Sequence, residues 1–383
     1  MNEWVEGKFS DVAEVIMGQS PVGSMCNNKG IGIPLLNGPT EFTSKFPLPV
    51  QFTTDARKLS KDGDLLFCVR GSTTGKMNWS NQVFAIGRGL AAIRHKKSEK
   101  ANPFIKAVLV HSLDEILAGS TGSTFPNVSR TDLENLKISL PPLPEQQAIA
   151  EVLSSIDDKI DLLHRNNKTL EEMAETLFRQ WFVEGAKEDW DVGSVNTLVN
   201  IRSGYPFKST SFTAHGSFRL ITIKNVQDGY LDLSRADYIT DVPKKTPDYC
   251  LLQTGDILLS LTGNVGRCCL VTTDNLLLNQ RVAKLEPKNH RDWAFVYFYF
   301  RLSSTRRNLE EISKGTAQSN LSPIETGKIE LLIPPSYLLS EYSKYVGPLL
   351  TKILANKTQI EELSQMRDTI LPKLMSGQVR VKA

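Results

Sequence analysis

The sequence contains few of the residues that build metal sites and disulfide frameworks. It has five cysteines and five histidines among 383 residues; the cysteines form no CxxC pair, and the histidines are scattered singly. Neither a zinc site nor a disulfide framework is therefore indicated. No apolar run approaches the roughly eighteen residues that cross a membrane, and the first residues lack the basic and apolar regions of a signal peptide. We expect a cytoplasmic protein with no membrane partner.

Motifs of nucleotide chemistry are missing as well. Residues 71–77 (GSTTGKM) resemble a phosphate-binding loop, but that motif needs four residues between its glycines and a Ser or Thr after its Lys. No GxGxxG follows a predicted strand, and the Asn-Pro-Pro-aromatic motif of amino-methyltransferases is absent. We therefore do not expect an enzyme that binds nucleotide or transfers methyl groups by itself.

The length and the charge pattern are the first positive signals. The chain exceeds the usual size of a single core, so two domains is the simplest count. The net charge is only +3, which by itself is a weak argument for a polyanionic partner. The distribution of charge along the chain is slightly more informative about such a partner, because two mildly basic blocks flank an acidic segment at residues 145–182.

The chain matches itself at a spacing of roughly 190 residues, in the same order along each half. The matching segments are the openings at Trp4 and Trp190, the predicted strands in GDLLFCVRG (residues 63–71) and GDILLSLTG (255–263), the predicted helices from Pro103 and Trp293, and residues 122–142 against 315–335. In the last pair Asn127 aligns with Asn320. Ser129 and Ser322 each precede an acid by three residues, which predicts a capping box at the start of a short helix.

Each half ends in a predicted long helix. Apolar residues alternate by three and four from Ile149 to Trp181, and again from Val346 to Ile370, which is typical of a coiled-coil seam. Each seam carries one asparagine, Asn167 or Asn356, in a matching NKT sequence. A buried asparagine on such a seam fixes the register of the helices at some cost in stability. The alternative is that both side chains are partly solvated.

A characteristic turn leads into the first long helix. It reads PPLPEQQAIAEVLSSIDDKI (residues 141–160), it follows a block of about 140 residues, and the whole unit is repeated. With these features the chain resembles the specificity subunits of Type I restriction-modification enzymes over essentially its full length. The second copy departs from the pattern, because residues 333–346 lack the EQQ triplet and four residues are missing before its NKT. We therefore expect the second helix to be shorter by about one turn.

The resemblance implies an α+β fold with two mixed α/β target-recognition domains, at residues 1–142 and 185–335. Long helices at residues 143–184 and 336–383 would form an antiparallel coiled coil that spaces two half-sites of a bipartite double-stranded DNA target. The implied partners are that DNA, two methyltransferase subunits that bring S-adenosylmethionine and, where present, two restriction subunits that bring ATP and Mg. The chain itself would hold no cofactor, metal or catalytic residue.

Loops rich in Arg, Lys, Asn and Gln are the expected DNA contacts, because these side chains reach phosphates and base edges. The candidates are Arg70, Ser72, Thr73, Lys76, Asn78 and Arg88 in the first half, and Lys224, Asn225, Thr262, Asn264, Arg267, Asn279, Gln280 and Arg281 in the second. The alternative is that these are ordinary solvated side chains. The repeated glycines, Gly71 with Gly263 and Gly75 with Gly266, would then serve the backbone geometry of a turn.

Two other classes of function stay open at this point. One is an enzyme with an unrecognised site, although no cluster of His, Cys and carboxylates recurs between the halves. The other is a scaffold whose coiled coil spaces two protein-binding domains. Salt-dependent affinity for DNA would separate a DNA reader from such a scaffold.

Overall fold

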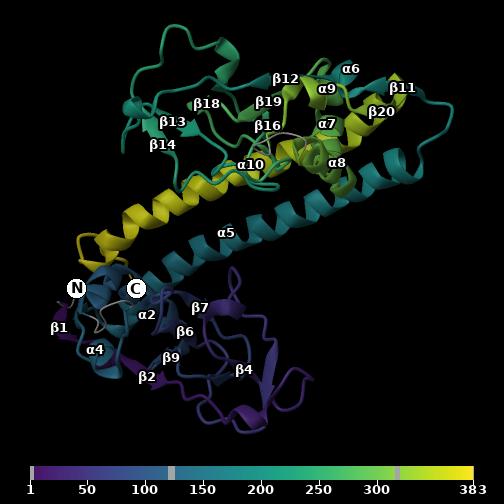
Figure 1. Cartoon of the computed structure of the whole chain (residues 1–383). Coiled ribbons are helices and arrows are strands. Elements are labelled where there is room, and N and C mark those ends of the chain that lie inside the picture. The colour runs from purple at the N-terminus through teal and green to yellow at the C-terminus, as the bar shows by residue number, and fades with distance from the viewer. Residues whose placement is uncertain (1–3, 120–125, 315–319, 383) are drawn as a thin grey trace. The chain divides into compact units, whose positions relative to one another are not determined.

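The computed structural model describes residues 4–119, 126–314 and 320–382 (Figure 1). The chain divides into two compact units, named here unit 1 (residues 1–162 and 362–383) and unit 2 (residues 163–361). The division falls inside each of two long helices, α5 (Leu143–Phe178) and α10 (Ser336–Met375). Each unit therefore contains a part of both helices. None of the described helices is long and apolar enough to cross a membrane.

Unit 1 contains three sheets. Its strands are β1 (Val5–Lys8), β2 (Ala13–Met17), β3 (Cys26–Asn27), β4 (Ile33–Leu36), β5 (Gln51–Thr53), β6 (Leu65–Cys68), β7 (Met77–Trp79), β8 (Ala85–Ile86), β9 (Leu90–His95) and β10 (Lys137–Leu140). The central sheet is antiparallel, in the order β2-β9-β6-β7. The outer sheet has the order β3-β5-β4-β8, with β4 and β8 parallel. The third sheet pairs β1 with β10.

Strand β6 shows why the apolar run at residues 64–69 is a strand. All four of its side chains are buried. Leu65 and Phe67 belong to the core that includes the helices, and Leu66 and Cys68 belong to the core beneath the outer sheet. Because side chains alternate between the faces of a strand, one apolar run fills both cores. The central sheet therefore lies between the helices and the outer sheet.

Unit 2 repeats the topology of the central sheet and the parallel pair of the outer sheet, so the repeat in the sequence is a repeat of the fold. Its strands are β11 (Asp191–Ser194), β12 (Val199–Ser203), β13 (Phe218–Ile221), β14 (Asp237–Ile239), β15 (Leu251–Leu252), β16 (Ile257–Ser260), β17 (Cys268–Leu270), β18 (Leu276–Leu278), β19 (Val282–Pro287) and β20 (Glu330–Ile333). The central sheet has the order β12-β19-β16-β17, and the outer sheet β14-β13-β18-β15 with β13 and β18 parallel. Strand β11 pairs with β20.

The short helices also recur in pairs. They are α1 (Phe9–Val12), α2 (Asn102–His111), α3 (Leu113–Gly119) and α4 (Arg130–Glu134) in unit 1, and α6 (Val195–Leu198), α7 (Trp293–Arg301), α8 (Ser303–Lys314) and α9 (Pro323–Gly327) in unit 2. The helices predicted from Pro103 and Trp293 are each broken in two, at Ser112 and at Leu302. The parts of the aligned segments at residues 122–125 and 315–319 lie outside the described residues.

The predicted capping boxes are formed once in full and once in half. At α4 the amide of Asp132 donates to Ser129 Oγ at 3.2 Å, and the amide of Ser129 donates to the Asp132 carboxylate at 2.7 Å. At α9 the amide of Glu325 donates to Ser322 Oγ at 3.4 Å, but the Glu325 carboxylate pairs with Lys328 at 2.8 Å. The second box therefore lacks its return bond, because a lysine one turn later binds the carboxylate.

The second long helix is shorter than the first, but by less than the expected turn. Helix α5 has 36 residues and continues into a π-helical segment of 6 residues (Arg179–Glu184), whereas α10 has 40 residues. The four residues missing before Asn356 are partly regained after it, because α10 continues to Met375. The helix predicted to run to residue 383 also ends early. Beyond Met375 the chain folds back, and the amide of Val379 donates to the Lys373 carbonyl at 3.0 Å.

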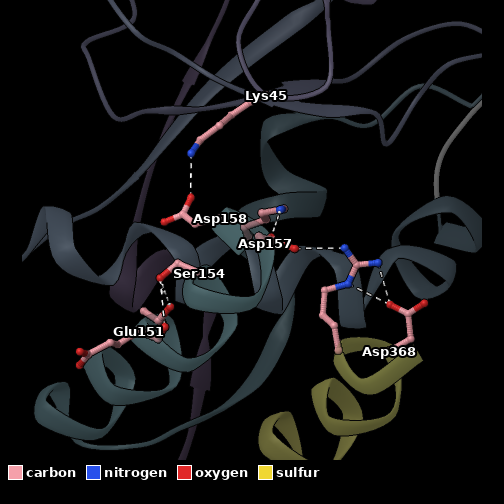
Figure 2. A network of polar contacts seen from close by, with 9 residues as sticks. Lys45, Glu151, Ser154, Asp157, Asp158 and Asp368 are labelled. Atoms are coloured by element: carbon pink, nitrogen blue, oxygen red, sulfur yellow. Dashed lines mark hydrogen bonds and ion pairs between the residues drawn. The ribbon is translucent and has the colours of Figure 1, made fainter. Parts of the chain in front are cut away.

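The two long helices contact each other within both units. In unit 1, Arg367 Nη1 lies 3.0 Å from Asp157 Oδ1 (Figure 2). In unit 2, Asn356 Nδ2 donates to Asn167 Oδ1 at 2.8 Å. The numbering rises along α5 as it falls along α10, so the helices run in opposite directions where they meet. Asn167 is 8% exposed and Asn356 is 1% exposed, so the alternative of partly solvated asparagines is wrong.

The EQQ triplet of the first copy attaches α5 to its domain. Glu145 accepts a hydrogen bond from Trp4 Nε1 at 3.2 Å, and it pairs with Arg380 of the C-terminal segment at 2.7 Å. Gln147 Nε2 donates to Ser98 Oγ at 2.8 Å. The motif that carried the family resemblance is therefore a structural junction at the start of the helix.

The middle residue of the triplet, Gln146, faces a buried histidine. His95 is 5% exposed, and its Nε2 lies 2.9 Å from Gln146 Oε1. Its Nδ1 accepts from the amides of Lys97 and Ser98, both at 3.1 Å. Since Nδ1 is an acceptor, the ring is neutral with its proton on Nε2. Burial lowers the pKa of His95 below its usual value of 6.5.

Acidification should therefore destabilise unit 1. The unfolded chain binds a proton at His95 near pH 6.5, and the folded chain binds it only at lower pH. The stability that the neutral ring provides is present above that value, and it is lost as the pH falls through the lower pKa of the folded state. We expect the thermal unfolding midpoint to fall less steeply between about pH 7.5 and pH 5.5 in H95Q than in the wild type.

The matched control is H215Q, because His215 is exposed in unit 2. It should keep the wild-type dependence on pH. Equal slopes for the wild type and H95Q would contradict a stabilising role for the neutral ring.

Candidate nucleic-acid interface

Two equivalent loops leave the central strands of the two units. Loop 69–76 joins β6 to β7, and loop 261–267 joins β16 to β17. Each is closed by an amide that donates back to the preceding strand, Gly75 at 2.8 Å and Gly266 at 3.0 Å. Both loop glycines in each unit have positive φ, between +73° and +92° (Gly71, Gly75, Gly263 and Gly266). The repeated glycines therefore do serve the turn, as the alternative interpretation held.

In unit 1, segments distant in the sequence meet loop 69–76 through backbone hydrogen bonds. The amide of Val69 donates to the Gly89 carbonyl at 2.9 Å, and its carbonyl accepts from the amide of Val128 at 2.9 Å. Arg70 forms a β-bridge with Asn127. The loop is thus held between the start of β9 and the segment before α4.

The same arrangement recurs in unit 2. The amide of Leu261 donates to the Arg281 carbonyl at 2.8 Å, and its carbonyl accepts from the amide of Leu321 at 2.7 Å. Thr262 forms a β-bridge with Asn320. The two asparagines that align in the sequence therefore occupy the same place in both units, beside the loop.

Most of the candidate residues gathered by these bonds reach the surface. Arg70, Ser72, Lys76, Arg88, Asn264, Gln280 and Arg281 are exposed, and Thr73, Thr262 and Arg267 are half-buried. Among the described residues, no ion pair includes Arg70, Lys76, Arg88 or Arg281. Cations without a carboxylate partner, beside amides and hydroxyls, suit the phosphates and base edges of a nucleic acid.

Arg281 has an unusual backbone. Its φ is +73°, in the left-handed region that disfavours side chains with a Cβ. The conformation is imposed by its neighbours, because the Arg281 carbonyl accepts from Leu261 and the amide of Gln280 donates to the Tyr205 carbonyl at 3.0 Å. Strain of this kind is concentrated at functional sites. Arg281 therefore places a guanidinium at a turn whose backbone conformation glycine would adopt at lower cost in free energy.

Two of the predicted DNA contacts are not surface groups. Asn78 is 4% exposed, and its Nδ2 donates to the Thr43 carbonyl at 2.7 Å. Asn225 is fully buried, and its Nδ2 donates to the Asp232 carbonyl at 2.9 Å. The prediction that they contact DNA is wrong in this structure, because both amides are used to hold loops of the outer sheet.

Lys224 and Asn279 are also engaged within the protein. Lys224 is exposed but pairs with Asp237 at 2.9 Å. Asn279 is 8% exposed, and its backbone amide donates to the Ile221 carbonyl at 3.0 Å, while its side-chain Oδ1 is buried without a hydrogen-bond partner among the described residues. Asn279 therefore supports the exposed Gln280 and Arg281 that follow it.

The turn after β2 belongs to the same surface and was missed in the sequence. Gln19 and Ser20 are exposed there, and Ser20 Oγ accepts from the amide of Arg88 at 3.2 Å. A Cβ on Gly18 would lie 2.2 Å from the Gly87 carbonyl oxygen, and one on Gly204 would lie 2.3 Å from the Asn279 carbonyl oxygen. Both turns need glycine, so the glycine that follows the first apolar segment of each half, in GQSP and GYP, was the signal that could have found them.

Two copies of one fold, each with exposed cations and amides gathered beside its central sheet, define a DNA-reading class of protein. A family model described as "Type I restriction modification DNA specificity domain" matches residues 1–172 and 187–365. The chain belongs to this family. The family's description assigns its domain to DNA specificity and not to catalysis.

Individual relatives agree with this assignment. The MjaX specificity subunit of Methanocaldococcus jannaschii is 39% identical over 158 residues, which span 41% of this chain and 37% of that relative. The HindI specificity subunit of Haemophilus influenzae is 21% identical over 471 aligned residues, which span 99% of this chain and all of that relative. A crystal structure of a Type I system S subunit from M. genitalium has a TM-score of 0.66 at 18% identity, covering 97% of this chain and 96% of that one. This likeness shows the shared fold.

The backbone at Arg281 leads to a test by stability. Arg281→Gly removes the Cβ that the left-handed region disfavours, whereas Arg281→Ala keeps it. We expect the glycine variant to be more stable than the alanine variant by about 1 kcal/mol in denaturant unfolding. Equal stabilities would show that the positive φ is not strained.

Arg88 provides the matched control, because it lies at the equivalent connection of unit 1 and has no positive φ. At position 88 we expect the alanine variant to be more stable than the glycine variant. Arg88→Gly should be the less stable of its pair by about 0.5–1 kcal/mol, since glycine loses more backbone entropy on folding.

Proposed function

We propose that this chain is the specificity subunit of a Type I restriction-modification enzyme and that each unit reads one half of a bipartite double-stranded DNA target. The observation that carries the proposal is the recurrence of the same exposed, cation-bearing loops at equivalent places of two repeated folds. A duplicated reader suits a ligand that presents two short sites on one repetitive backbone. The relatives named as specificity subunits support the assignment.

The exposed side chains divide into two roles in this proposal. Lys76 and Arg88 of unit 1 would neutralise phosphates, which makes affinity depend steeply on salt, whereas Arg70 would contact a base edge. Asn264 and Gln280 of unit 2 carry amides that can pair with base edges in the major groove. At equivalent positions the two units carry different side chains, so the two half-sites would differ in sequence.

The target-recognition domains in this proposal are residues 1–142 and 185–335, with the long helices as an antiparallel coiled coil that spaces them. At 1.5 Å per residue, the 36 residues of α5 extend about 54 Å. This length exceeds one turn of DNA, about 34–36 Å, which is the natural separation of two half-sites on one face of the duplex. A spacer of fixed length makes the gap between half-sites part of the recognised sequence.

Catalysis belongs to partner subunits in this proposal. Two methyltransferase subunits would bring S-adenosylmethionine, and restriction subunits would bring ATP and Mg. Exposed apolar side chains on the long helices support docking there: Leu162 and Met173 on α5 are 41% and 50% exposed, and Met366 on α10 is 57% exposed. Such a reader works where the DNA is, which is the reason to place it in the cytoplasm.

The proposal is tested by mapping methylation. The chain is co-expressed with its methyltransferase subunit, and modified positions are mapped across the genome by single-molecule sequencing. We expect a split motif with one fixed gap. Arg70→Ala should relax or weaken one half of the motif, and Arg281→Ala should do so in the other half, by about 1–3 kcal/mol for each lost base contact.

Lys137→Ala and Lys328→Ala are the controls, because both lysines are exposed beside the β1–β10 and β11–β20 sheets, away from the loops. They should leave both halves of the motif unchanged. A continuous motif, or one that neither loop variant alters, would reject the two-reader proposal. Absence of methylation together with salt-independent DNA binding would favour the scaffold instead.

The asparagine pair gives a second test. Asn356→Leu leaves the amide of Asn167 buried without its partner, so we expect a loss of about 1–3 kcal/mol in unfolding free energy. The double variant N167L/N356L removes both polar groups and should recover most of that loss. Additive losses would show that the two amides do not stabilise each other.

The proposed role of the pair in register is checked in the same methylation assay. With the double variant, the gap in the split motif should lose its single value, because no polar pair then selects one register. An unchanged gap would assign the register to the domain cores.

A further inference from the structure

We name loop 69–76 of unit 1 and loop 261–267 of unit 2 the recognition loops. In each unit, one segment next to the outer sheet connects the strand after the recognition loop, β7 or β17, to the helices. In unit 1 it is residues 37–50, between β4 and β5, which we name brace 1. In unit 2 it is residues 222–233, which follow β13, and we name this segment brace 2. The two buried asparagines described above bond to these segments. Asn78 donates to a carbonyl of brace 1, and Asn225 donates to a carbonyl within brace 2.

Brace 2 is a hairpin with its own hydrogen bonds. The amide of Asp232 donates to the Asn225 carbonyl at 2.8 Å, and the amide of Gln227 donates to the Tyr230 carbonyl at 3.0 Å. The Asn225 side chain closes its base. Gly229 completes the tip with a φ of +81°. The tip, residues 227–229, therefore has a defined shape.

One side of this tip bonds to the end of the recognition loop. Gln227 Oε1 accepts a hydrogen bond from the Arg267 guanidinium. Gln227 Nε2 donates to the Lys224 carbonyl at 2.9 Å, which fixes the orientation of the carboxamide. The amide of Gly229 donates to the Cys268 carbonyl at 2.9 Å, at the start of β17. The direction of Arg267 is thus set by a residue outside its own loop.

The other side of the tip bonds to the helices. Asp228 lies 3.4 Å from Arg306 of α8 and 3.8 Å from Arg301 of α7. Lys357 of α10 donates to the Gly229 carbonyl at 3.2 Å. Arg301 in turn pairs with Glu175 of α5 at 3.3 Å. The brace therefore links the recognition loop to both long helices.

Arg301 is the buried centre of this link. Its side chain is 14% exposed, and burial lowers its pKa to about 10, so it remains charged at neutral pH. Its guanidinium packs against the brace so closely that a Cβ on Gly229 would lie 3.0 Å from Nη2. A charged group held this tightly by carboxylates of α5 and the brace resists displacement.

Brace 1 makes a related connection with different chemistry. The carbonyl of Thr43 accepts from Asn78 Nδ2 at 2.7 Å, and the carbonyl of Lys45 accepts from the amide of Trp79 at 2.9 Å, both on β7. Lys45 Nζ then pairs with Asp158 of α5 at 2.7 Å, as Figure 2 shows. Brace 1 thus joins the strand after loop 69–76 to α5, whereas brace 2 bonds to its loop and to α10.

We propose that the two braces hold the recognition loops at a fixed position on the long helices, and that Gln227 and Asp228 are positioning residues that direct Arg267 toward DNA. The inference rests on the proposed function for its link to DNA reading. Its physical basis is preorganisation, because an arginine already held in its bound direction loses less rotamer freedom on binding. A helix-anchored loop also keeps its half-site at the distance that the spacer sets.

The first test needs no DNA. Hydrogen exchange is measured at the amides of loop 261–267 in the full chain for Gln227→Ala, Asp228→Asn and the control Gln253→Ala. Gln253 is exposed, and its polar contacts among the described residues run through its backbone amide and carbonyl. Gln227→Ala and Asp228→Asn should speed exchange in the loop severalfold, and Gln253→Ala should not. Unchanged exchange in both brace variants overturns the brace, whatever the DNA results.

The second test asks whether Gln227 acts through Arg267. Affinity is measured for the complex with methyltransferase on a duplex that carries the mapped motif, using Q227A, R267A and Q227A/R267A. Each single variant should weaken binding by about tenfold, and the double variant should bind no more weakly than R267A. The preferences in the half-site read by unit 1 should stay unchanged.

The outcomes separate the two levels of the proposal. Additive losses in the double variant, with faster exchange in Q227A, would make the brace a structural link and overturn its positioning role. Absence of any bipartite motif would reject the proposed function, and the positioning role with it, while the exchange experiment still decides whether the braces fix the loops.

Discussion

The shared use of α5 and α10 by two cores is the constraint on which the rest of the structure depends. Ile149 of α5 and Leu374 of α10 lie in the core of unit 1, and Phe178 of α5 and Tyr342 of α10 lie in the core of unit 2. Neither core is complete without both helices. The long helices are therefore parts of both cores, and any change in their packing acts on the sheets that carry loops 69–76 and 261–267.

The parts that could be predicted from the sequence are those set by local patterns. The order of the repeat, the buried central strands and the long helices follow from apolar spacing within short windows. The equivalence of Asn127 and Asn320 also followed from alignment of the two halves, but their β-bridges to Arg70 and Thr262 did not. The end of α10 at Met375 was not predicted, because the last turn is placed by the core of unit 1, in which Leu374 and Met375 are buried.

The fate of individual polar residues could not be predicted, because it is decided by distant partners. Asn78 is buried since the carbonyl of Thr43, 35 positions earlier, accepts its amide. Arg281 adopts a positive φ because Leu261, Tyr205 and their strands fix the turn around it. A loop rich in amides and cations therefore predicts the place of a binding surface better than it predicts which of its side chains face the ligand.

Backbone hydrogen bonds form the part of the frame around loops 69–76 and 261–267 that the two units share. Val69 and Leu261 make the same pair of bonds in the two units, although their neighbours Arg70 and Thr262 share no chemistry. Backbone bonds do not depend on side-chain identity, so exposed side chains can change with little effect on stability. The braces limit that freedom. In the proposed DNA-reading role, Arg267, which bonds to Gln227, would change its specificity only together with the brace, so coupled substitutions at those two positions are the expected route to a new half-site.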